Sequence, residues 1–315
     1  MILAMKDVEK IYGEQKVLQD LNFEIATGEI FVLVGPSGSG KTTTLKMING
    51  LIQPSSGEIY FKEKNLSSYN LQKVRWQMGY VLQEIALFPT MTVQENIEVI
   101  PEMLGWSKEK RHKTTRHLLA DVGLDPDVYA QRMPEELSGG EQQRIGILRA
   151  IASEPDIILM DEPFSALDPI SRTSLQDLVL SLHEKLQTTI VFVTHNMQEA
   201  LRLGTRIAVM HEGKIVQCDR PEKIINEPAT EFVQQFFKDT ADEKHFLKQT
   251  LAEHLHHFDL AKENKEAPKV SVDTSIKEIL QVFSTTEGVN LTQGQRVLGY
   301  LTIQEFLKKI SQEEV

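Results

Sequence analysis

Short runs of apolar residues recur along the first part of the chain, separated by polar turns and amphipathic stretches. Residues 30–34, 157–160 and 190–193 contain no polar position at all. Strands that are buried on both faces show continuous apolar runs of this length, whereas helices show longer, periodic patterns. Residues 42–48, which follow the first run closely, have a helical pattern. The alternation predicts an α/β fold with a mostly parallel sheet covered by helices.

The segment between two of these runs has a different character. Residues 86–151 are polar and amphipathic, with Pro89, Pro101 and Pro134 as interruptions. Prolines at such intervals divide a chain into short helices and turns. We therefore expect a helical subdomain of about residues 86–151, inserted into the α/β core.

The composition changes again after Phe237. Residues 238–269 are rich in charged and amide side chains and predict a polar linker or solvated helix. Apolar residues return in residues 270–315, first at strand spacing and then at helical spacing, and residues 297–301 predict a later strand. We expect a small C-terminal α+β segment of order β-α-β-α, too small to bury a full core alone.

A glycine-rich sequence joins the first buried strand to its helix. It fits the pattern G-x-x-x-x-G-K-[ST] and consists of Gly35, Pro36, Ser37, Gly38, Ser39, Gly40, Lys41 and Thr42, with Thr43 next. Glycines let backbone N–H groups approach phosphate oxygens, and the start of the helix adds its positive dipole end. The ammonium of Lys41 would neutralise β- and γ-phosphates, and the Thr42 hydroxyl would bind Mg²⁺. The motif predicts a P-loop nucleotide site.

Two acidic residues follow the buried run 157–160. In P-loop enzymes an aspartate at such a strand end holds Mg²⁺, which is the role expected for Asp161. Glu162 would then orient and deprotonate the attacking water. Taken alone, the pair could merely end a strand before Pro163, but the phosphate motif upstream favours the catalytic interpretation.

Composition narrows the classes of partner. The formal net charge is −11, and an acidic surface repels phosphate backbones, so nucleic acid is not expected as a direct partner. The single cysteine, Cys218, cannot form an internal disulfide, which fits a reducing compartment. The apolar runs have strand length and not membrane-span length. We expect a soluble protein whose membrane role, if it has one, comes through a partner.

A second glycine motif identifies a family. Residues 137–144 read Leu-Ser-Gly-Gly-Glu-Gln-Gln-Arg, in which Ser138, Gly139 and Gly140 precede a helix expected to begin near Glu141. This sequence resembles the signature of the ATP-binding-cassette (ABC) ATPases. A single chain would have no use for two γ-phosphate-binding motifs around one nucleotide. In this family two copies form a head-to-tail homodimer, and the signature of each copy closes on the ATP bound by the other. The resemblance implies ATP as substrate, Mg²⁺ as cofactor and ATPase activity.

Four further positions match this family residue by residue. Tyr12 resembles the aromatic residue that stacks on adenine, and its alternative is a core or hairpin tyrosine. Gln83, after the expected strand 79–82, resembles the glutamine that touches Mg²⁺ and the attacking water. Residues 165–168, which end in Asp168, resemble the loop that crosses the dimer interface beside the nucleotide. His195 resembles the histidine that contacts the γ-phosphate; a lone histidine is commonly structural, but this one ends a parallel strand.

The resemblance implies a nucleotide-binding domain over residues 1–237 and a transport role. Residues 87–97 resemble the region that importer ATPases present to their permease subunits, which would place the protein on the cytoplasmic face of the membrane. Residues 101–106 and 162–169 resemble the branch for glycine betaine, carnitine and choline. A solute-binding protein, separate or fused to the permease, is then also expected.

The sequence leaves more than one interpretation open for the function of the chain and for the role of its C-terminal segment. An ABC ATPase acting on nucleic acid or the ribosome is the first rival to the importer, and a metabolite kinase using the same phosphate loop is the second. Residues 270–315 resemble one half of a tandem of cystathionine-β-synthase-type (CBS) modules. This partial CBS-like segment is expected either to sense ionic strength or a nucleotide, or only to aid dimerisation.

Overall fold

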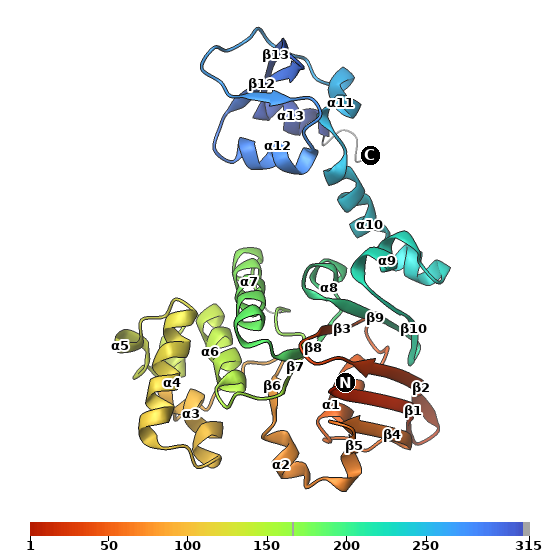
Figure 1. Cartoon of the computed structure of the whole chain (residues 1–315), viewed down its shortest axis with the longest axis vertical. Coiled ribbons are helices and arrows are strands. Elements are labelled where there is room, and N and C mark those ends of the chain that lie inside the picture. The colour runs from red at the N-terminus through yellow and green to blue at the C-terminus, as the bar shows by residue number, and fades with distance from the viewer. Residues whose placement is uncertain (166, 311–315) are drawn as a thin grey trace. The chain divides into compact units, whose positions relative to one another are not determined.

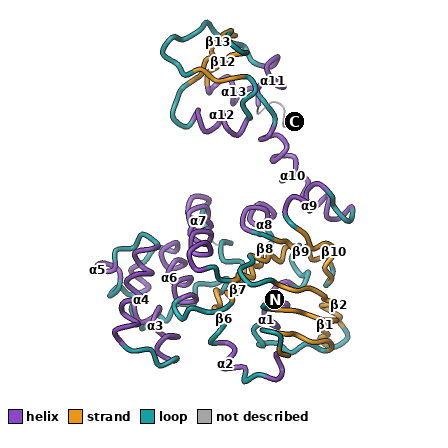
Figure 2. Tube along the Cα trace, viewed as in Figure 1, coloured by secondary structure: helices purple, strands orange, loops and turns teal. Residues whose placement is uncertain are grey.

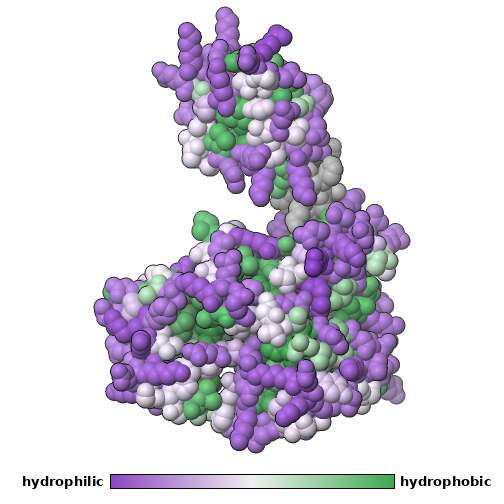
Figure 3. Space-filling view, in the orientation of Figure 1, coloured by the Kyte–Doolittle hydropathy of each residue, from purple (hydrophilic) through white to green (hydrophobic). Residues whose placement is uncertain are grey.

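The computed structural model describes residues 1–165 and 167–310 of the chain. The described chain divides into two compact units, Met1–Phe236 and Phe237–Val315 (Figure 1). Hydrophilic residues cover most of the face seen in Figure 3, in both units. Within the described part of the chain, none of the helices combines the length and the apolar character that a membrane span requires.

A six-stranded sheet of order β10-β9-β3-β8-β7-β6 forms the centre of the first unit (Figure 2). Its strands are β3 (Ile30–Val34), β6 (Met78–Val81), β7 (Ile157–Asp161), β8 (Thr189–Thr194), β9 (Arg206–His211) and β10 (Lys214–Asp219). Five of them run parallel, and only β10 is antiparallel to its neighbour. Every residue of β3, β7 and β8 is buried, as the apolar runs predict.

A second, antiparallel sheet of order β2-β1-β4-β5 packs against the six-stranded sheet through a shared core cluster. Its strands are β1 (Leu3–Tyr12), β2 (Gln15–Ile25), β4 (Ser56–Phe61) and β5 (Lys64–Asn65). Helix α1 (Lys41–Ile48) buries Leu45 and Ile48 in one core cluster with residues of both sheets. Packing against two sheets fixes the direction of α1 and therefore the position of its first turn.

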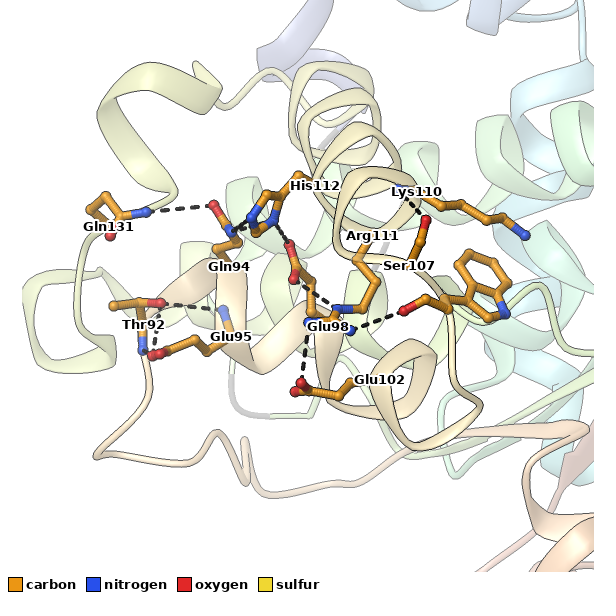
Figure 4. A network of polar contacts seen from close by, with 11 residues as sticks. Thr92, Gln94, Glu95, Glu98, Glu102, Ser107, Lys110, Arg111, His112 and Gln131 are labelled. Carbon is orange, nitrogen blue, oxygen red and sulfur yellow. Dashed lines mark hydrogen bonds and ion pairs between the residues drawn. The ribbon is translucent and has the colours of Figure 1, made fainter.

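Helices α3 (Val93–Met103), α4 (Lys108–Asp121), α5 (Pro126–Tyr129) and α6 (Gly139–Ile151) occupy the segment expected to be helical. The side chain of Thr92 accepts a hydrogen bond from the backbone of Glu95, whose carboxylate in turn binds the backbone of Thr92, and so starts α3. Between α3 and α4, the buried carboxylate of Glu98 contacts Arg111 at 3.3 Å and His112 at 2.7 Å (Figure 4). This polar network holds the two helices together.

The remaining helices of the first unit are α2 (Leu71–Arg75), α7 (Pro169–Leu186), α8 (Met197–Leu203) and α9 (Pro221–Asn226). Figure 1 shows α7 and α8 on the side of the six-stranded sheet opposite α1. Helix α10 (Glu231–Lys248) begins in the first unit and continues into the second.

The second unit has its own core, built on a three-stranded sheet of order β11-β12-β13. Its elements are α11 (Leu251–His254), β11 (Lys269–Ser271), α12 (Ile276–Phe283), β12 (Gly288–Gln293), β13 (Arg296–Thr302) and α13 (Ile303–Ile310). The expected order β-α-β-α is therefore wrong, because an additional strand, β12, lies between α12 and β13. Strand β12 pairs with β11 in parallel and with β13 antiparallel.

The polar segment 238–269 is also more structured than expected. Leu251 is fully buried, Phe258 is 7% exposed, and both belong to the core cluster of the second unit. The backbone of Ala261 bonds to Tyr300 of β13 in both directions. The interpretation of residues 251–261 as a linker is therefore wrong, because a few apolar side chains anchor this charged sequence to the sheet.

Candidate functional site

The phosphate loop, residues 35–42, joins β3 to α1 and needs glycine at two positions. Gly40 is the N-cap of α1 with φ 99°, and a Cβ atom there would lie 2.2 Å from Leu18 Cδ2. A Cβ on Gly35 would lie 2.1 Å from the carbonyl oxygen of Met210. Because Gly40 has no side chain, none caps the first turn of α1, and the N–H groups there stay directed toward a ligand.

Lys41 is held inside this loop. Its ammonium donates hydrogen bonds to the carbonyl oxygens of Gly35 at 2.8 Å and Pro36 at 2.9 Å, and the residue is only 5% exposed. Burial lowers the pKa of Lys41, and the carboxylates of Glu162 and Asp161 oppose that shift. Nearby, the buried hydroxyl oxygen of Ser39 has no hydrogen-bond partner. The loop thus presents a cation and a free hydroxyl where a phosphate would lie.

Asp161 at the end of β7 meets the start of α1. Its carboxylate accepts a hydrogen bond of 2.9 Å from the Thr42 hydroxyl. Burial raises the pKa of Asp161, while the Thr42 hydrogen bond and the charge of Lys46 act in the opposite direction. A carboxylate and a hydroxyl oxygen in contact are donors of the kind that Mg²⁺ prefers. The pair fits a magnesium ion, as the sequence predicts.

Glu162 and His195 extend from neighbouring strands and contact each other. Nδ1 of His195, which follows β8, lies 3.0 Å from Oε2 of Glu162. The backbone of Glu162 has φ 44°, and its N–H donates to the carbonyl oxygen of Val193 at 3.0 Å. A left-handed glutamate costs about 1–3 kcal/mol, and such strain is found mainly at functional sites. This turn aims the carboxylate at the imidazole.

Gln83 lies exposed just beyond β6, whose last residue is Val81. In the sheet, β3, β8, β7 and β6 are consecutive parallel strands. Their carboxyl ends therefore share one edge, and this edge carries the phosphate loop, His195, the acidic pair and Gln83. Ligands of parallel α/β sheets bind at that edge.

Tyr12 ends β1 in the antiparallel sheet, outside this edge. The residue is 47% exposed, and the ammonium of Lys10 lies 4.8 Å from its ring centroid. This exposure rules out a core tyrosine. The alternative of a hairpin tyrosine matches its position, because Tyr12 pairs with Gln15 beside the turn between β1 and β2. Stacking of Tyr12 on adenine stays a prediction.

The signature motif, residues 137–144, lies at the start of α6. Helix α6 begins at Gly139, two residues before the expected start, because the hydroxyl of Ser138 caps the N–H of Glu141. The carboxylate of Glu141 accepts from the N–H of Ser138 at 2.8 Å and from the hydroxyl of Tyr129 at 2.6 Å. Ser138 and Gly139 are exposed. In the described part of the chain, no hydrogen bond or ion pair joins this motif to the phosphate loop.

The interface loop, residues 165–168, is separated from Glu162 by Pro163 and Phe164, and its Ala166 lies outside the described residues. The carboxylate of Asp168 accepts hydrogen bonds of 3.1 Å from the N–H groups of Ile170 and Ser171, so it caps α7. The hydrogen bonds with Ser171 lower the pKa of Asp168. The carboxylate predicted to lie at the nucleotide is thus engaged within its own helix cap.

Two residues beside the site escaped prediction from the sequence. Arg172 of α7 donates to the carbonyl oxygen of Leu167 at 3.0 Å. Glu199 of α8 is 6% exposed, accepts from the Thr194 hydroxyl at 2.6 Å, and has a pKa raised by burial. Each stands four residues after a predicted site residue, one after Asp168 and the other after His195. This spacing alone gives no signal of function, because His195 precedes α8 and the contact between Arg172 and Glu199 is tertiary.

The segment after Gln83 is ordered by one buried side chain. The amide of Asn96 is fully buried, accepts from the N–H of Phe88 at 2.8 Å and donates to the carbonyl oxygens of Phe88, Met91 and Thr92 at 3.0–3.1 Å. Phe88 itself is 46% exposed. An apolar side chain is thereby presented on a rigid loop.

Comparison with known proteins gives consistent results. Residues 18–165 match the family model described as ABC transporter. The chain is 50% identical over 236 residues to the glycine betaine/carnitine/choline transport ATP-binding protein OpuCA of Bacillus subtilis, covering 75% of this chain and 62% of OpuCA. It is 42% identical over 307 residues to the choline transport ATP-binding protein OpuBA of the same organism, covering 96% of this chain and 79% of OpuBA. The match to OpuCA thus spans less than two thirds of that relative.

A solved structure shares the fold. It is described as a dimeric, post-hydrolysis state of the ATP-binding cassette MJ0796 bound to ADP and Pi, with 34% identity and a TM-score of 0.62. The alignment covers 70% of this chain and 99% of that one. The α/β class and the P-loop core predicted from the sequence are therefore confirmed.

Proposed function

The chain belongs to the ABC transporter family, and on this premise we propose that it is the ATP-hydrolysing subunit of an importer for small osmoprotectants. The observation that carries the proposal is the meeting of Lys41, Thr42, Asp161, Glu162 and His195 at one edge of the sheet. This edge combines a phosphate cradle, a metal position and a base, which are the parts that phosphoryl transfer to water requires.

Each residue has a distinct task in the proposed reaction. The ammonium of Lys41 and the N–H groups at the start of α1 bind the phosphate oxygens and offset their charge. The carboxylate of Glu162 accepts a proton from the attacking water, and His195 orients that carboxylate through its 3.0 Å contact. Thr42, Asp161 and Gln83 are the residues that would hold Mg²⁺, which would supply positive charge to offset the negative charge on the phosphate.

We further propose that two copies of the chain complete each other's sites. The signature motif has an exposed helix start but makes no hydrogen bond or ion pair with the phosphate loop of its own chain among the described residues. A second copy placed head to tail would bring Ser138, Gly139 and Gly140 to the γ-phosphate. The description of MJ0796 as a dimer supports this arrangement.

The transport role rests on the named relatives. OpuCA and OpuBA are transport ATP-binding proteins for quaternary amines, and the sequence alone suggests the same branch. We propose that residues 87–97 contact permease subunits, that a solute-binding protein delivers the solute, and that the chain lies on the cytoplasmic face of the membrane. The same relatives favour the importer over an ATPase that acts on nucleic acid.

For the second unit we keep two proposed roles. Its partial CBS-like sequence suits a sensor of ionic strength or of a nucleotide, and its separate core suits a dimerisation module. The alignment with OpuBA reaches across nearly the whole chain, so this unit has a counterpart in a choline transport protein.

Reconstitution tests the proposed function. The chain would be assembled in vesicles with permease and solute-binding subunits from the same organism. Phosphate release and uptake of labelled glycine betaine, carnitine and choline would then be measured. We expect ATP-dependent uptake of at least one of these solutes, and neither uptake nor phosphate release with Lys41→Ala. Phosphate release without uptake of any quaternary amine would refute the solute class. Equal phosphate release by Lys41→Ala would refute the site.

A further inference from the structure

A closed circuit of contacts links the interface loop to the catalytic pair. The hydroxyl of Ser165 donates to the carbonyl oxygen of Glu162 at 3.0 Å, which holds the start of the loop. At its end, the carbonyl oxygen of Leu167 accepts from Nη2 of Arg172 at 3.0 Å. The loop is therefore bound at both ends by groups of its own chain.

The other half of the circuit passes through Glu199. One carboxylate oxygen lies 3.9 Å from Nε of Arg172, and the other accepts a 2.6 Å hydrogen bond from the Thr194 hydroxyl. Thr194 is the last residue of β8, 2% exposed, and directly precedes His195. Because His195 contacts Glu162, the circuit returns to its starting point. Six of the seven residues of the circuit line one small cavity, and the seventh, Leu167, bonds to Arg172.

Burial shows that this arrangement is more than a surface ion pair. Glu199 is 6% exposed, and a buried carboxylate is costly unless charged and hydrogen-bonding groups offset it. Nε of Arg172 is buried yet has no hydrogen-bond partner among the described residues, since 3.9 Å to the Glu199 carboxylate is too long. A shift of about 1 Å would bring the two atoms to the 2.7–2.9 Å of a charge-assisted hydrogen bond. The contact can therefore tighten when the loop moves.

We propose that Arg172 and Glu199 are positioning residues that couple the interface loop to the Glu162–His195 pair. In the proposed dimer the loop faces the second copy, so the approach of that copy would displace the loop. Arg172 would then pass the displacement to Glu199, and Glu199 would fix the end of β8 from which His195 reaches Glu162. Neither residue touches the nucleotide or the reacting atoms. This inference rests on the proposed ATP hydrolysis.

Steady-state kinetics with Mg²⁺-ATP test the coupling. For Arg172→Gln and Glu199→Gln we expect kcat to fall about 10–100-fold, the loss that a misplacement of about 1 Å produces, with KM for ATP changed less than twofold. Arg172→Lys keeps the charge but cannot reach both acceptors, so it should recover part of kcat. The double variant should be no slower than the slower single variant, because both changes break one link.

A matched control breaks another contact between the same helices. Arg202 of α8 bonds to Asp177 of α7 at 2.6 Å, outside the circuit, and Asp177→Asn should keep the wild-type kcat. Wild-type kcat in Arg172→Gln or Glu199→Gln would overturn the proposal, as would multiplying effects in the double variant. A loss of fluorescent-ATP binding or of the folding transition that parallels the loss of kcat would also overturn it, in favour of a structural role. Absence of phosphate release from the wild-type chain would instead refute the proposed function itself.

Discussion

Two charged residues of the candidate site are buried, and burial makes their charged forms unfavourable in the nucleotide-free protein. Lys41 and Asp161 are both nearly buried, and burial is the largest cause of the pKa shift in each. The Lys41 ammonium donates a hydrogen bond to a backbone carbonyl oxygen, and the Asp161 carboxylate accepts one from the Thr42 hydroxyl. Both partners are neutral groups. Triphosphate and metal charges would supply the missing compensation. The buried charges therefore lower the free energy of unfolding of the nucleotide-free protein, and ligand binding would offset this loss.

This cost predicts a pH-dependent gain of stability on removing one charge. The pKa of Asp161 is higher in the folded chain than in the unfolded chain, so its ionised form destabilises the fold at any pH above both values. Asp161→Asn can keep the contact with Thr42 while removing the charge, so it should raise the nucleotide-free Tm at pH 7. As the pH falls through the range in which the carboxyl protonates, the gain should vanish.

Calorimetry from pH 7 to pH 4 would measure the Tm of Asp161→Asn and of a control variant, Asp127→Asn. Asp127 is exposed, and its hydrogen bond with Arg116 lowers its pKa, so Asp127→Asn should leave Tm unchanged or slightly lower it. A lower Tm for Asp161→Asn at pH 7 would contradict the account of a buried, poorly compensated carboxylate.

Motif residues were predictable from the sequence because their geometry is local. The phosphate loop needs only a strand, glycines and a helix in succession, and all three are visible in the residue pattern. The contact between Glu162 and His195 depends on β7 and β8 being neighbours, which no spacing in the sequence reveals. Arg172 and Glu199 were missed because their importance arises from tertiary contacts.

At the scale of elements, the loop after Gln83 depends on Asn96 and the helices beyond it depend on Glu98. Asn96 satisfies one N–H and three carbonyl groups of residues 88–92, and Glu98 joins α3 to Arg111 and His112 of α4 (Figure 4). Buried polar groups of this kind fix a single geometry because the alternatives leave donors or acceptors unsatisfied.

Asn96→Ala should therefore lower the free energy of unfolding by about 2–4 kcal/mol, since several buried backbone groups lose their partner. Gln94→Ala on the same helix, at a half-buried position, should cost less than about 1 kcal/mol. Urea denaturation of both variants would give the difference. Equal stability of the two variants would show that the Asn96 amide does not organise this loop.

Strand β12 shows why a polar strand escapes sequence reasoning. It contains Asn290, which is 1% exposed and whose side chain bonds to the backbone of Asn264 and Ala267. From the pattern alone, an asparagine between two glycines indicates a turn. Satisfaction of this side chain by a distant segment makes the strand possible, and no local signal reports it.

At the scale of the whole molecule, α10 belongs to both units. Its first turn is part of the cassette, because Phe232 stacks on His211 with ring centroids 3.8 Å apart and Val233 is fully buried. The second unit has a core of its own. The division of labour between the units can therefore be tested by cutting the chain after this helix.

A chain that ends after residue 248 should hydrolyse ATP within about twofold of the full-length rate, since every predicted site residue lies in the first unit. A chain that ends after residue 230 loses the packing of Phe232 and Val233 and should have a lower Tm. Phosphate release and thermal unfolding of the three chains would be compared. Loss of hydrolysis in the chain of 248 residues would show that the cassette does not act without the second unit.

The central claim is that Glu162 activates water at a site completed by a second copy of the chain. Glu162→Gln keeps the size of the side chain but removes the base, so hydrolysis should fall about 10²–10⁴-fold while ATP binding persists. Light scattering of this variant, coupled to phosphate measurement, tests both halves at once. For the chain that ends after residue 248, which lacks the core of the second unit, we expect the mass of two chains with Mg²⁺-ATP and of one chain when Lys41→Ala is added. A mass of one chain at saturating ATP, or phosphate release at the wild-type rate, would contradict it.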